Sequence, residues 1–389
     1  MNKFCSIFSQ LLQLFPRYEF QKLVKQTHAE RHARGFTCWG QFVAMLFCQL
    51  GRAHSLREIT EGLKSCEGKL KHLGILAPHR STLAYANEHR SWQLYQELFL
   101  LLLQRIQSQG IGQKKFRFKN KLVSLDSTII DLSLSLFNWA HFRRTKGAIK
   151  IHLLLDHDGY LPNFAWITEA KVADIQIARQ ILFPPGTIVV DDRAYNDYRL
   201  FGRWTSQKVY FVTRLKENAQ YEVVGEGDPP QNRNILKDQL IEFTDPVSRE
   251  KCPYPLRLIQ VYDPDKNEVY FFLTNHMGLG ATTIAAIYKD RWQIEIFFKY
   301  LKQYLKIKTF VGTSPNAVKI QIWTALIAML MLRHLQLMAR FAWSLSNLVA
   351  LLRMNLFTHR DLWAWLNQPF DTPPADYEPE QLTLNLGLI

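Results

Sequence analysis

A row of polar side chains between residues 288 and 306 offers the clearest chemistry in this 389-residue chain. At about 100° of rotation per residue, one face of a helix would carry six of them. They are Tyr288, Arg291, Glu295, Lys299, Lys302 and Lys306. One carboxylate among cations suits a polyanion held beside a metal-binding acid, and it also fits an exposed helix with ordinary i, i+4 ion pairs. The opposite face is apolar and predicts a core-facing stripe of Ile294, Phe297, Leu301, Tyr304 and Leu305.

A second acid, Asp126, follows the apolar residues 122–125, which predict a strand. An ionised carboxylate in such a strand is unfavourable unless it is paired or bound to a metal ion. The residues alone fit equally well an aspartate that closes the strand and caps the next turn. Both roles are therefore open for Asp126 at this point.

Two further acids, Asp191 and Asp192, follow a short apolar strand predicted at 187–190. Strands buried on both faces are apolar throughout, so periodicity does not tell which of the two acids faces a site. His152, in the predicted strand 148–155, either lines the site or is an ordinary core histidine. Four other aspartates are expected in turns or caps: Asp131, Asp156, Asp158 and Asp174. No nucleotide-binding loop, zinc motif or Ser/His/Asp arrangement is apparent along the sequence.

Basic charge is concentrated at the N-terminal end of the chain. The formal net charge is +14, and residues 1–120 contain 18 Lys and Arg against 7 Asp and Glu. This region is predicted to be helical, and Ser55 and Glu58 have the spacing of a capping box. The predicted helices are 37–50, 55–62 and 81–106. Short helices in a basic context are typical of helical hairpins, including helix-turn-helix readers, and indicate nucleic acid or another anionic partner.

Strands and helices alternate from residue 122 onward, which predicts a mixed sheet with helices on both faces. Strands are expected at 122–126, 148–155, 161–168, 187–190 and 210–214, and helices at 173–182, 196–206, 316–342 and 345–357. Residues 218–280 interrupt this alternation with three strand-like segments and predict a β-rich insertion. The expected boundaries are 1–112, 113–217, 218–280, 281–345 and 346–389.

The remaining composition favours a protein of a reduced, cytosolic compartment. Five cysteines are scattered without metal-finger spacing, and no signal peptide is expected. The most apolar run, 322–332, is broken by Arg333 and His334 and is expected to be too short to span a membrane. The tail from Gln368 is Pro-rich and acidic and is expected to be loosely ordered.

The spacing Tyr-x2-Arg-x3-Glu-x6-Lys at residues 288–302 resembles the signature of bacterial insertion-sequence DDE transposases, in the Tyr-Arg-Glu-Lys group that includes the Tn5 enzyme. Asp126, followed by Ser, and Asp192, directly before Arg193 and a small residue, resemble the two aspartates of that family. The resemblance selects Asp192 over Asp191. It implies an α/β, ribonuclease-H-like mixed sheet with a β-rich insertion, preceded by a helical N-terminal domain.

In this family the two aspartates and the glutamate hold divalent ions. The resemblance therefore implies that Asp126, Asp192 and Glu295 bind two Mg²⁺ or Mn²⁺ ions for phosphoryl transfer. Water would nick the transposon end, the freed 3′-hydroxyl would attack the next strand, and relatives excise through a hairpin. The implied contacts to DNA phosphates are Tyr288, Arg291 and Lys302, with Lys299 and Arg193 as lesser candidates.

The implied partner is double-stranded DNA, namely the terminal inverted repeats of the element and its target. A homodimer on DNA is expected, in the bacterial cytoplasm and at the nucleoid, without a membrane. Two alternatives stay open: a catalytically idle DNA-binding protein on the same fold, and a structure-selective ribonuclease-H-like nuclease.

Overall fold

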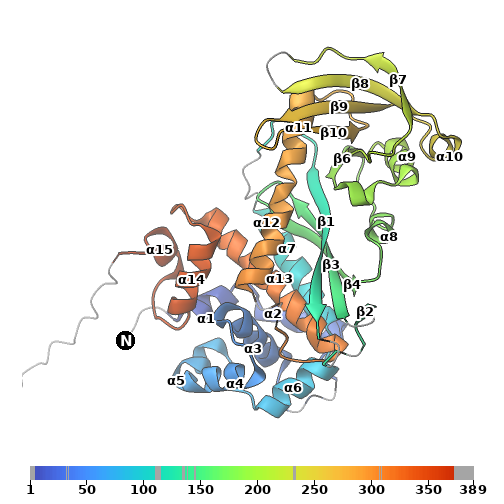
Figure 1. Cartoon of the computed structure of the whole chain (residues 1–389). Helices are drawn as coiled ribbons and strands as arrows, with labels where there is room; N and C mark the ends of the chain where they lie inside the picture. The colour runs from blue at the N-terminus through green and yellow to red at the C-terminus, as the bar shows by residue number, and fades with distance from the viewer. Residues whose placement is uncertain are drawn as a thin grey trace, which may run out of the picture.

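The computed structural model describes residues 5–371, except 32, 34, 110–114, 134, 135, 138, 144, 145, 231–233, 306 and 308. Predictions for most of the acidic tail, for Lys306 and for Lys114 therefore lie outside the described residues. Figure 1 shows a group of helices beside an elongated sheet, and a long helical rod lies along that sheet.

The N-terminal helices are α1 (Ile7–Leu12), α2 (Arg17–Gln26), α3 (Cys38–Gly51), α4 (Leu56–Ser65), α5 (Glu67–Leu70), η1 (Lys71–Leu73), α6 (Arg80–His89) and α7 (Gln93–Ser108). The Ser55 side chain accepts a hydrogen bond from Glu58 N, which confirms the predicted capping box. The helix predicted at 81–106 is wrong in one respect. Arg90 has extended backbone angles and ends α6, so α7 starts as a separate helix.

The ten strands of the described residues are β1 (Leu122–Leu132), β2 (His141–Arg143), β3 (Lys146–Asp156), β4 (Leu161–Glu169), β5 (Ile188–Val190), β6 (Tyr210–Arg214), β7 (Tyr221–Glu226), β8 (Ile235–Phe243), β9 (Leu256–Asp263) and β10 (Glu268–Thr274). They form one sheet in the order β2-β3-β1-β5-β6-β10-β9-β8-β7, and β4 also pairs with β3. The β3–β4 hairpin confirms the predicted turn at 156–159.

Strand β1 pairs antiparallel with β3 and parallel with β5, and β5 pairs parallel with β6. β1 runs six residues past Asp126 to Leu132. An aspartate that closes the strand is therefore wrong for Asp126, and Asp131 lies inside the same strand rather than in a turn. Asp126 is a mid-strand carboxylate, directly across from Leu153 of β3.

The helices around the sheet are α8 (Asp174–Ala178), η2 (Arg193–Tyr195), α9 (Tyr198–Ser206), α10 (Pro246–Lys251), α11 (Ala281–Asp290) and α12 (Trp292–Tyr304). α11 and α12 lie end to end along the sheet beside β1 (Figure 1). They replace the single helix predicted across 288–302. At the junction the amides of Arg291 and Ile294 bond to carbonyls three residues back, at Tyr288 and Arg291, which marks a tightened turn.

Three C-terminal helices complete the fold: α13 (Pro315–Met338), α14 (Leu345–Asn355) and α15 (Leu362–Asn367). By length and composition alone α13 could cross a membrane, so the expectation of too short an apolar run is wrong. Yet 83% of its most apolar window is buried inside the protein, as in the core helix of a globular fold.

One hydrophobic core joins the two ends of the chain to the sheet. It contains Phe42 of α3, Leu102 of α7, Leu326 of α13, Leu153 of β3 and Leu301 of α12. The apolar faces of the N-terminal helices are thus covered by helices that follow the sheet in sequence. This packing fixes α12 and β1 relative to each other, and the site described next lies between them.

Candidate active site

Asp126 projects from the middle of β1 toward α12. Its Oδ1 accepts a hydrogen bond from Ser127 N at 2.7 Å, and its Oδ2 lies 3.2 Å from Arg291 Nη1. Burial raises the pKa of this carboxyl to about 7, against the opposing influence of Ser127 N–H and Arg291. Asp192 and Glu295 raise it further, so both lie close enough to act on Asp126 through space.

Arg291 connects the strand to the helix. Its Nη2 lies 2.6 Å from Glu295 Oε1, one helical turn away, so one guanidinium contacts both Asp126 and Glu295. The Arg291 side chain is 13% exposed. Burial alone would lower the pKa of Arg291, but Tyr288, Asp126 and Glu295 together raise it. Two of the three acids singled out in the sequence are thus brought together around a buried cation.

Asp192 lies at the start of η2, directly after β5. Its Oδ1 caps η2 by accepting a hydrogen bond from Ala194 N at 2.8 Å. The side chain lines an open hollow of about 630 Å³ together with Arg193, Lys216 and Glu217. The third acid therefore faces a space that can receive a large ligand, and Lys216 is a cation of this space that the sequence did not single out.

Asp191 is fully buried, and among the described residues neither carboxylate oxygen has a hydrogen-bond partner. Burial raises the pKa of this carboxyl well above its ordinary value. An unpaired buried carboxyl is one of the least stable arrangements in a protein interior. Asp191 therefore stays a rival to Asp192.

The donor set fits a divalent cation by its chemistry, because Mg²⁺ and Mn²⁺ prefer carboxylate oxygens. The buried, unpaired oxygens of Asp191 are consistent with this fit. Within the described ranges, no three His, Cys, Asp or Glu side chains lie close enough together to hold one ion. In this arrangement Arg291 supplies the positive charge to Asp126 and Glu295.

The remaining described residues of the predicted polar row lie on α11 and α12. Ile294, Phe297 and Leu301 are buried, which confirms the predicted apolar stripe. Lys299 is exposed and lines a hollow of about 450 Å³ with Glu295 and Trp292. Lys302 is half-buried in the last turn. Tyr288 lies in α11, with its ring 4.5 Å from that of Phe272 and 5.6 Å from Arg291 Cζ.

His152 packs across from Ser127 of β1, as a cross-strand residue. Its Nε2 lies 2.9 Å from Thr168 Oγ1, and its Nδ1 lies 3.4 Å from Asp174 Oδ1. Burial lowers the pKa of His152 to about 4. Asp174 also lies 3.2 Å from the buried Lys150 Nζ. These contacts assign His152 to the packing beneath the site.

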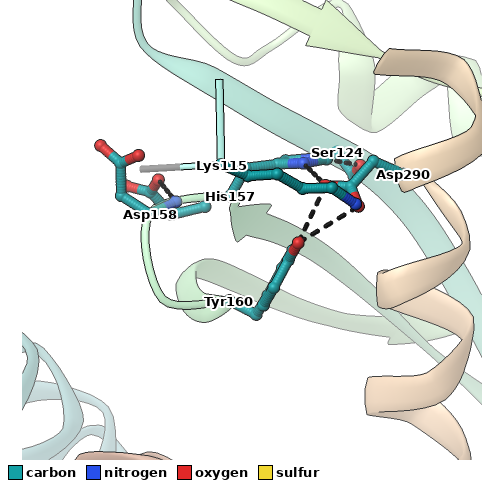
Figure 2. A network of polar contacts seen from close by, with 7 residues as sticks. Lys115, Ser124, His157, Asp158, Tyr160 and Asp290 are labelled. Carbon is teal, nitrogen blue, oxygen red and sulfur yellow. Dashed lines mark hydrogen bonds and ion pairs between the residues drawn. The ribbon is translucent and has the colours of Figure 1, made fainter. Parts of the chain in front are cut away.

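The structure brings together a Ser, a His and an Asp that the sequence did not single out. His157 lies between Ser124 of β1 and Asp290 at the end of α11, and Tyr160 and Lys115 also contact Asp290 (Figure 2). The three residues are 33 and 133 positions apart, so spacing along the chain gives no signal of it.

Two family models match this chain. A transposase DDE domain matches residues 117–331, and a domain of unknown function matches residues 5–76. A putative transposase of Sinorhizobium fredii is 33% identical and covers 78% of this chain and 84% of its own length. A probable transposase for insertion sequence element IS5377 of Geobacillus stearothermophilus is 27% identical, in an alignment that covers 67% of this chain and 68% of the relative. Among solved structures, the cryo-EM structure of the piggyBac transposase synaptic complex with hairpin DNA aligns with 96% of this chain and 84% of its own chain. The sequence identity is 10% and the TM-score is 0.44.

The chain therefore belongs to the DDE transposase family. It is an enzyme of DNA transposition, and dependence on divalent metal ions is a general property of this family. The acids on β1, after β5 and on α12 lie within or close to the catalytic domain that defines the match.

Proposed function

We propose that this protein cleaves the ends of a bacterial insertion sequence and joins them to target DNA, with Asp126, Asp192 and Glu295 as its catalytic acids. The observation that carries this assignment is the contact of one buried Arg291 guanidinium with both Asp126 and Glu295. It places a strand carboxylate and a helix carboxylate on opposite sides of one positive charge.

The proposed fold of the catalytic part is ribonuclease-H-like. The strand order β4-β3-β1-β5-β6, with β3 alone running opposite to the other four, supports it. Strands β7 to β10 continue the sheet beyond β6 and correspond to the β-rich insertion. We also infer that the enzyme is a member of the Tyr-Arg-Glu-Lys group, because Tyr288, Arg291, Glu295 and Lys302 keep its spacing.

In the proposed reaction, a water oxygen bonds to the scissile phosphorus and the bond to the 3′-oxygen breaks. The oxygen of the freed 3′-hydroxyl then bonds to a phosphorus of the next strand, the bond from that phosphorus to its own 3′-oxygen breaks, and the leaving 3′-oxygen takes up a proton. Two Mg²⁺ or Mn²⁺ ions, when bound, would activate the attacking oxygen and stabilise the leaving one. The protein supplies carboxylates from three rigid elements, which limits how far the ligands can move during the reaction.

DNA would lie across the exposed cations near these acids. Lys299 of α12, Arg193 of η2 and Lys216 border the two hollows that contain Glu295 and Asp192. Tyr288 of α11 and Lys302 of α12 would extend this surface along the two helices. Arg291 contacts two carboxylates, and it would reach a phosphate only after releasing them.

Residues 1–112 would recognise the terminal inverted repeats, because they contain 14 Lys and Arg against 7 Asp and Glu. We infer a homodimer on double-stranded DNA, since each end must be held while the other is processed, and action at the bacterial nucleoid. An idle DNA-binding protein and a structure-selective nuclease are the alternatives. The first would cut no DNA, and the second would cut branched DNA without requiring terminal repeats.

Replacing Glu295 by Gln tests the proposal. This change keeps size and hydrogen bonding but removes the charge that holds a divalent ion, so nicking of an end duplex should fall by orders of magnitude. Binding of the duplex should persist or tighten, because a negative charge leaves a surface that faces phosphates. The readouts are nicking with Mg²⁺ or Mn²⁺ and gel-shift binding.

The matched control is Glu250→Gln on α10, an exposed glutamate outside residues 1–112 that lines neither of the two hollows. It should nick at the wild-type rate. Undiminished nicking by Glu295→Gln would remove Glu295 from the catalytic acids. A wild-type protein that cuts branched DNA but ignores terminal repeats would favour the nuclease alternative.

A further inference from the structure

A buried hydrogen-bonded bridge links β1 to the end of α11. His157 Nε2 lies 2.7 Å from Ser124 Oγ, and His157 Nδ1 lies 2.6 Å from Asp290 Oδ2 (Figure 2). Tyr160 OH donates to both oxygens of Asp290 at 3.1 Å, and Lys115 forms an ion pair with it. The exposed fractions of Ser124, His157 and Asp290 are 0%, 2% and 3%.

The order of residues resembles a hydrolytic triad, but the surroundings exclude that chemistry. Ser124 is fully buried, and the hollow beside His157 has a volume of about 10 Å³. Such a space holds about one water molecule and no substrate. The three residues therefore act on one another and on the elements that carry them.

The bridge runs beside the contact made by Arg291. Side chains two residues apart on a strand point to the same face, so Ser124 and Asp126 both face the helical rod. Asp290 and Arg291 are consecutive at the junction of α11 and α12. Two bridges thus connect β1 to this junction, one through His157 and one through Arg291.

Asp290 is held in a place that its charge disfavours. Its side chain is only 1% exposed, and burial disfavours an ionised carboxylate. Lys115, His157 and Tyr160 offset this cost by their contacts with its two oxygens. A buried carboxylate with three such partners has its main role in the contacts it makes.

The two bridges differ in their relation to a divalent ion. A divalent ion held by Asp126 and Glu295 would replace Arg291 as their source of positive charge, since the guanidinium contacts both carboxylates. The His157 bridge uses no oxygen of the three proposed catalytic acids, and it therefore persists when the Arg291 contacts are exchanged.

We propose that Ser124, His157 and Asp290 are positioning residues that keep the α11–α12 junction in register with β1 while Arg291 releases Asp126 and Glu295. This inference rests on the proposed function, because the release is required only if those acids bind the ions. The bridge fixes the separation between a strand ligand and a helix ligand at the moment when their shared guanidinium departs.

Two substitutions of His157 separate the halves of the bridge. Asn places an amide near the position of Nδ1 and keeps the contact to Asp290, whereas Gln places one near Nε2 and keeps the contact to Ser124. Each should raise the Mg²⁺ concentration for half-maximal end nicking about tenfold or more, as for residues that orient metal ligands. Metal-free binding of the end duplex should change less than about twofold.

A second measurement uses no metal and no activity. Hydrogen exchange of the amides at 288–294 is compared for wild type, His157→Asn, Arg291→Gln and the double variant. Loss of either bridge alone should accelerate exchange modestly, because the other remains. The acceleration of exchange in the double variant should exceed the product of the accelerations in the two single variants. Purely multiplicative effects would overturn the inference.

Controls separate positioning from general stability. His334→Gln changes another buried histidine, in α13, and should lower the melting temperature without changing the half-saturating Mg²⁺ concentration. If the His157 variants fold poorly, Ser124→Ala replaces them in the test, because it removes only one oxygen atom. It should also raise the Mg²⁺ concentration for half-maximal nicking. His157 variants with a lower melting temperature but an unchanged Mg²⁺ requirement would overturn the proposal. A wild-type protein that nicks no end duplex would refute the proposed function instead, and the exchange cycle would still test the bridge.

Discussion

Arg291 holds two carboxylates of the candidate site, Asp126 and Glu295, within hydrogen-bonding distance. Separating a buried ion pair by removing one partner costs about 3–5 kcal/mol, because the other charge is left unpaired. The contact therefore makes these two carboxylates a stable part of the fold. It also means that Arg291, which the sequence predicted to contact DNA phosphates, has a structural role in the fold.

His152 should make stability depend on pH below neutrality. Its pKa falls to about 4 by burial, with Asp174 acting in the opposite direction and Lys150 in the same direction. The unfolded chain therefore binds the proton more readily, and the contribution of neutral His152 is complete above about pH 6.5 and lost as the pH falls to about 4. The loss amounts to at most about 3 kcal/mol.

His152→Gln retains a polar atom near Thr168 but does not titrate. Chemical denaturation of both proteins between pH 7 and pH 4 should show the smaller decrease in unfolding free energy for the variant. The difference between the two curves isolates His152 from the carboxylates that titrate in the same range. Parallel curves would show that His152 carries its proton equally in both states.

At the scale of elements, the sequence predicted the strand of Asp126, the β3–β4 hairpin and the apolar stripe of α12. These follow from local periodicity. It did not predict strand β8 or the junction at Arg291, since the contacts that hold these elements come from distant residues. The Ser124–His157–Asp290 bridge belongs to the same class, because only tertiary packing brings β1, a hairpin turn and a helix end together.

The acids show the same division. Asp126 and Glu295 were selected by their residue types and by family spacing, and the structure places them on one guanidinium. The choice between Asp191 and Asp192 depends on the direction of a chain leaving a strand buried on both faces. Asp192 faces the open hollow and Asp191 the interior, which the sequence of an apolar strand does not encode.

Lys299 presents an exposed charge on α12, near Glu295. Lys299→Ala should weaken binding to end duplexes regardless of their sequence and should reduce the slope of log affinity against log salt by about 1. Titrations at several salt concentrations measure both effects. Lys251→Ala on α10 is the matched exposed control and should leave the slope unchanged. An unchanged slope for Lys299→Ala would make α12 an ordinary solvated face.

At the scale of the whole molecule, the N-terminal helices are not closed by their own residues. α13 packs against α3, α6 and α7, and Asn316 at its start donates to the carbonyls of Asn87 and Arg90. The side chain of Gln10 bonds to Arg360 O and Leu362 N near α15. The beginning and the end of the described chain thus form one folding unit with the sheet.

A fragment of residues 1–115 should consequently fail to fold on its own. It would expose the faces of α3 and α7 that α13 covers, so we expect no cooperative thermal transition by circular dichroism. Adding a 116–389 fragment should restore part of the transition and of the binding to terminal-repeat DNA. A 1–115 fragment that melts cooperatively by itself would contradict this prediction.

The shared core sets an order of events during translation. The ribosome releases the basic N-terminal helices long before α13, α14 and α15 exist, and until then their apolar faces have no partner. Recognition of an element's ends by these helices, as proposed above, would therefore become available only when synthesis is nearly complete. A frameshifted or prematurely terminated copy of the gene would yield no folded recognition module, and so no product that competes with the intact enzyme for those ends.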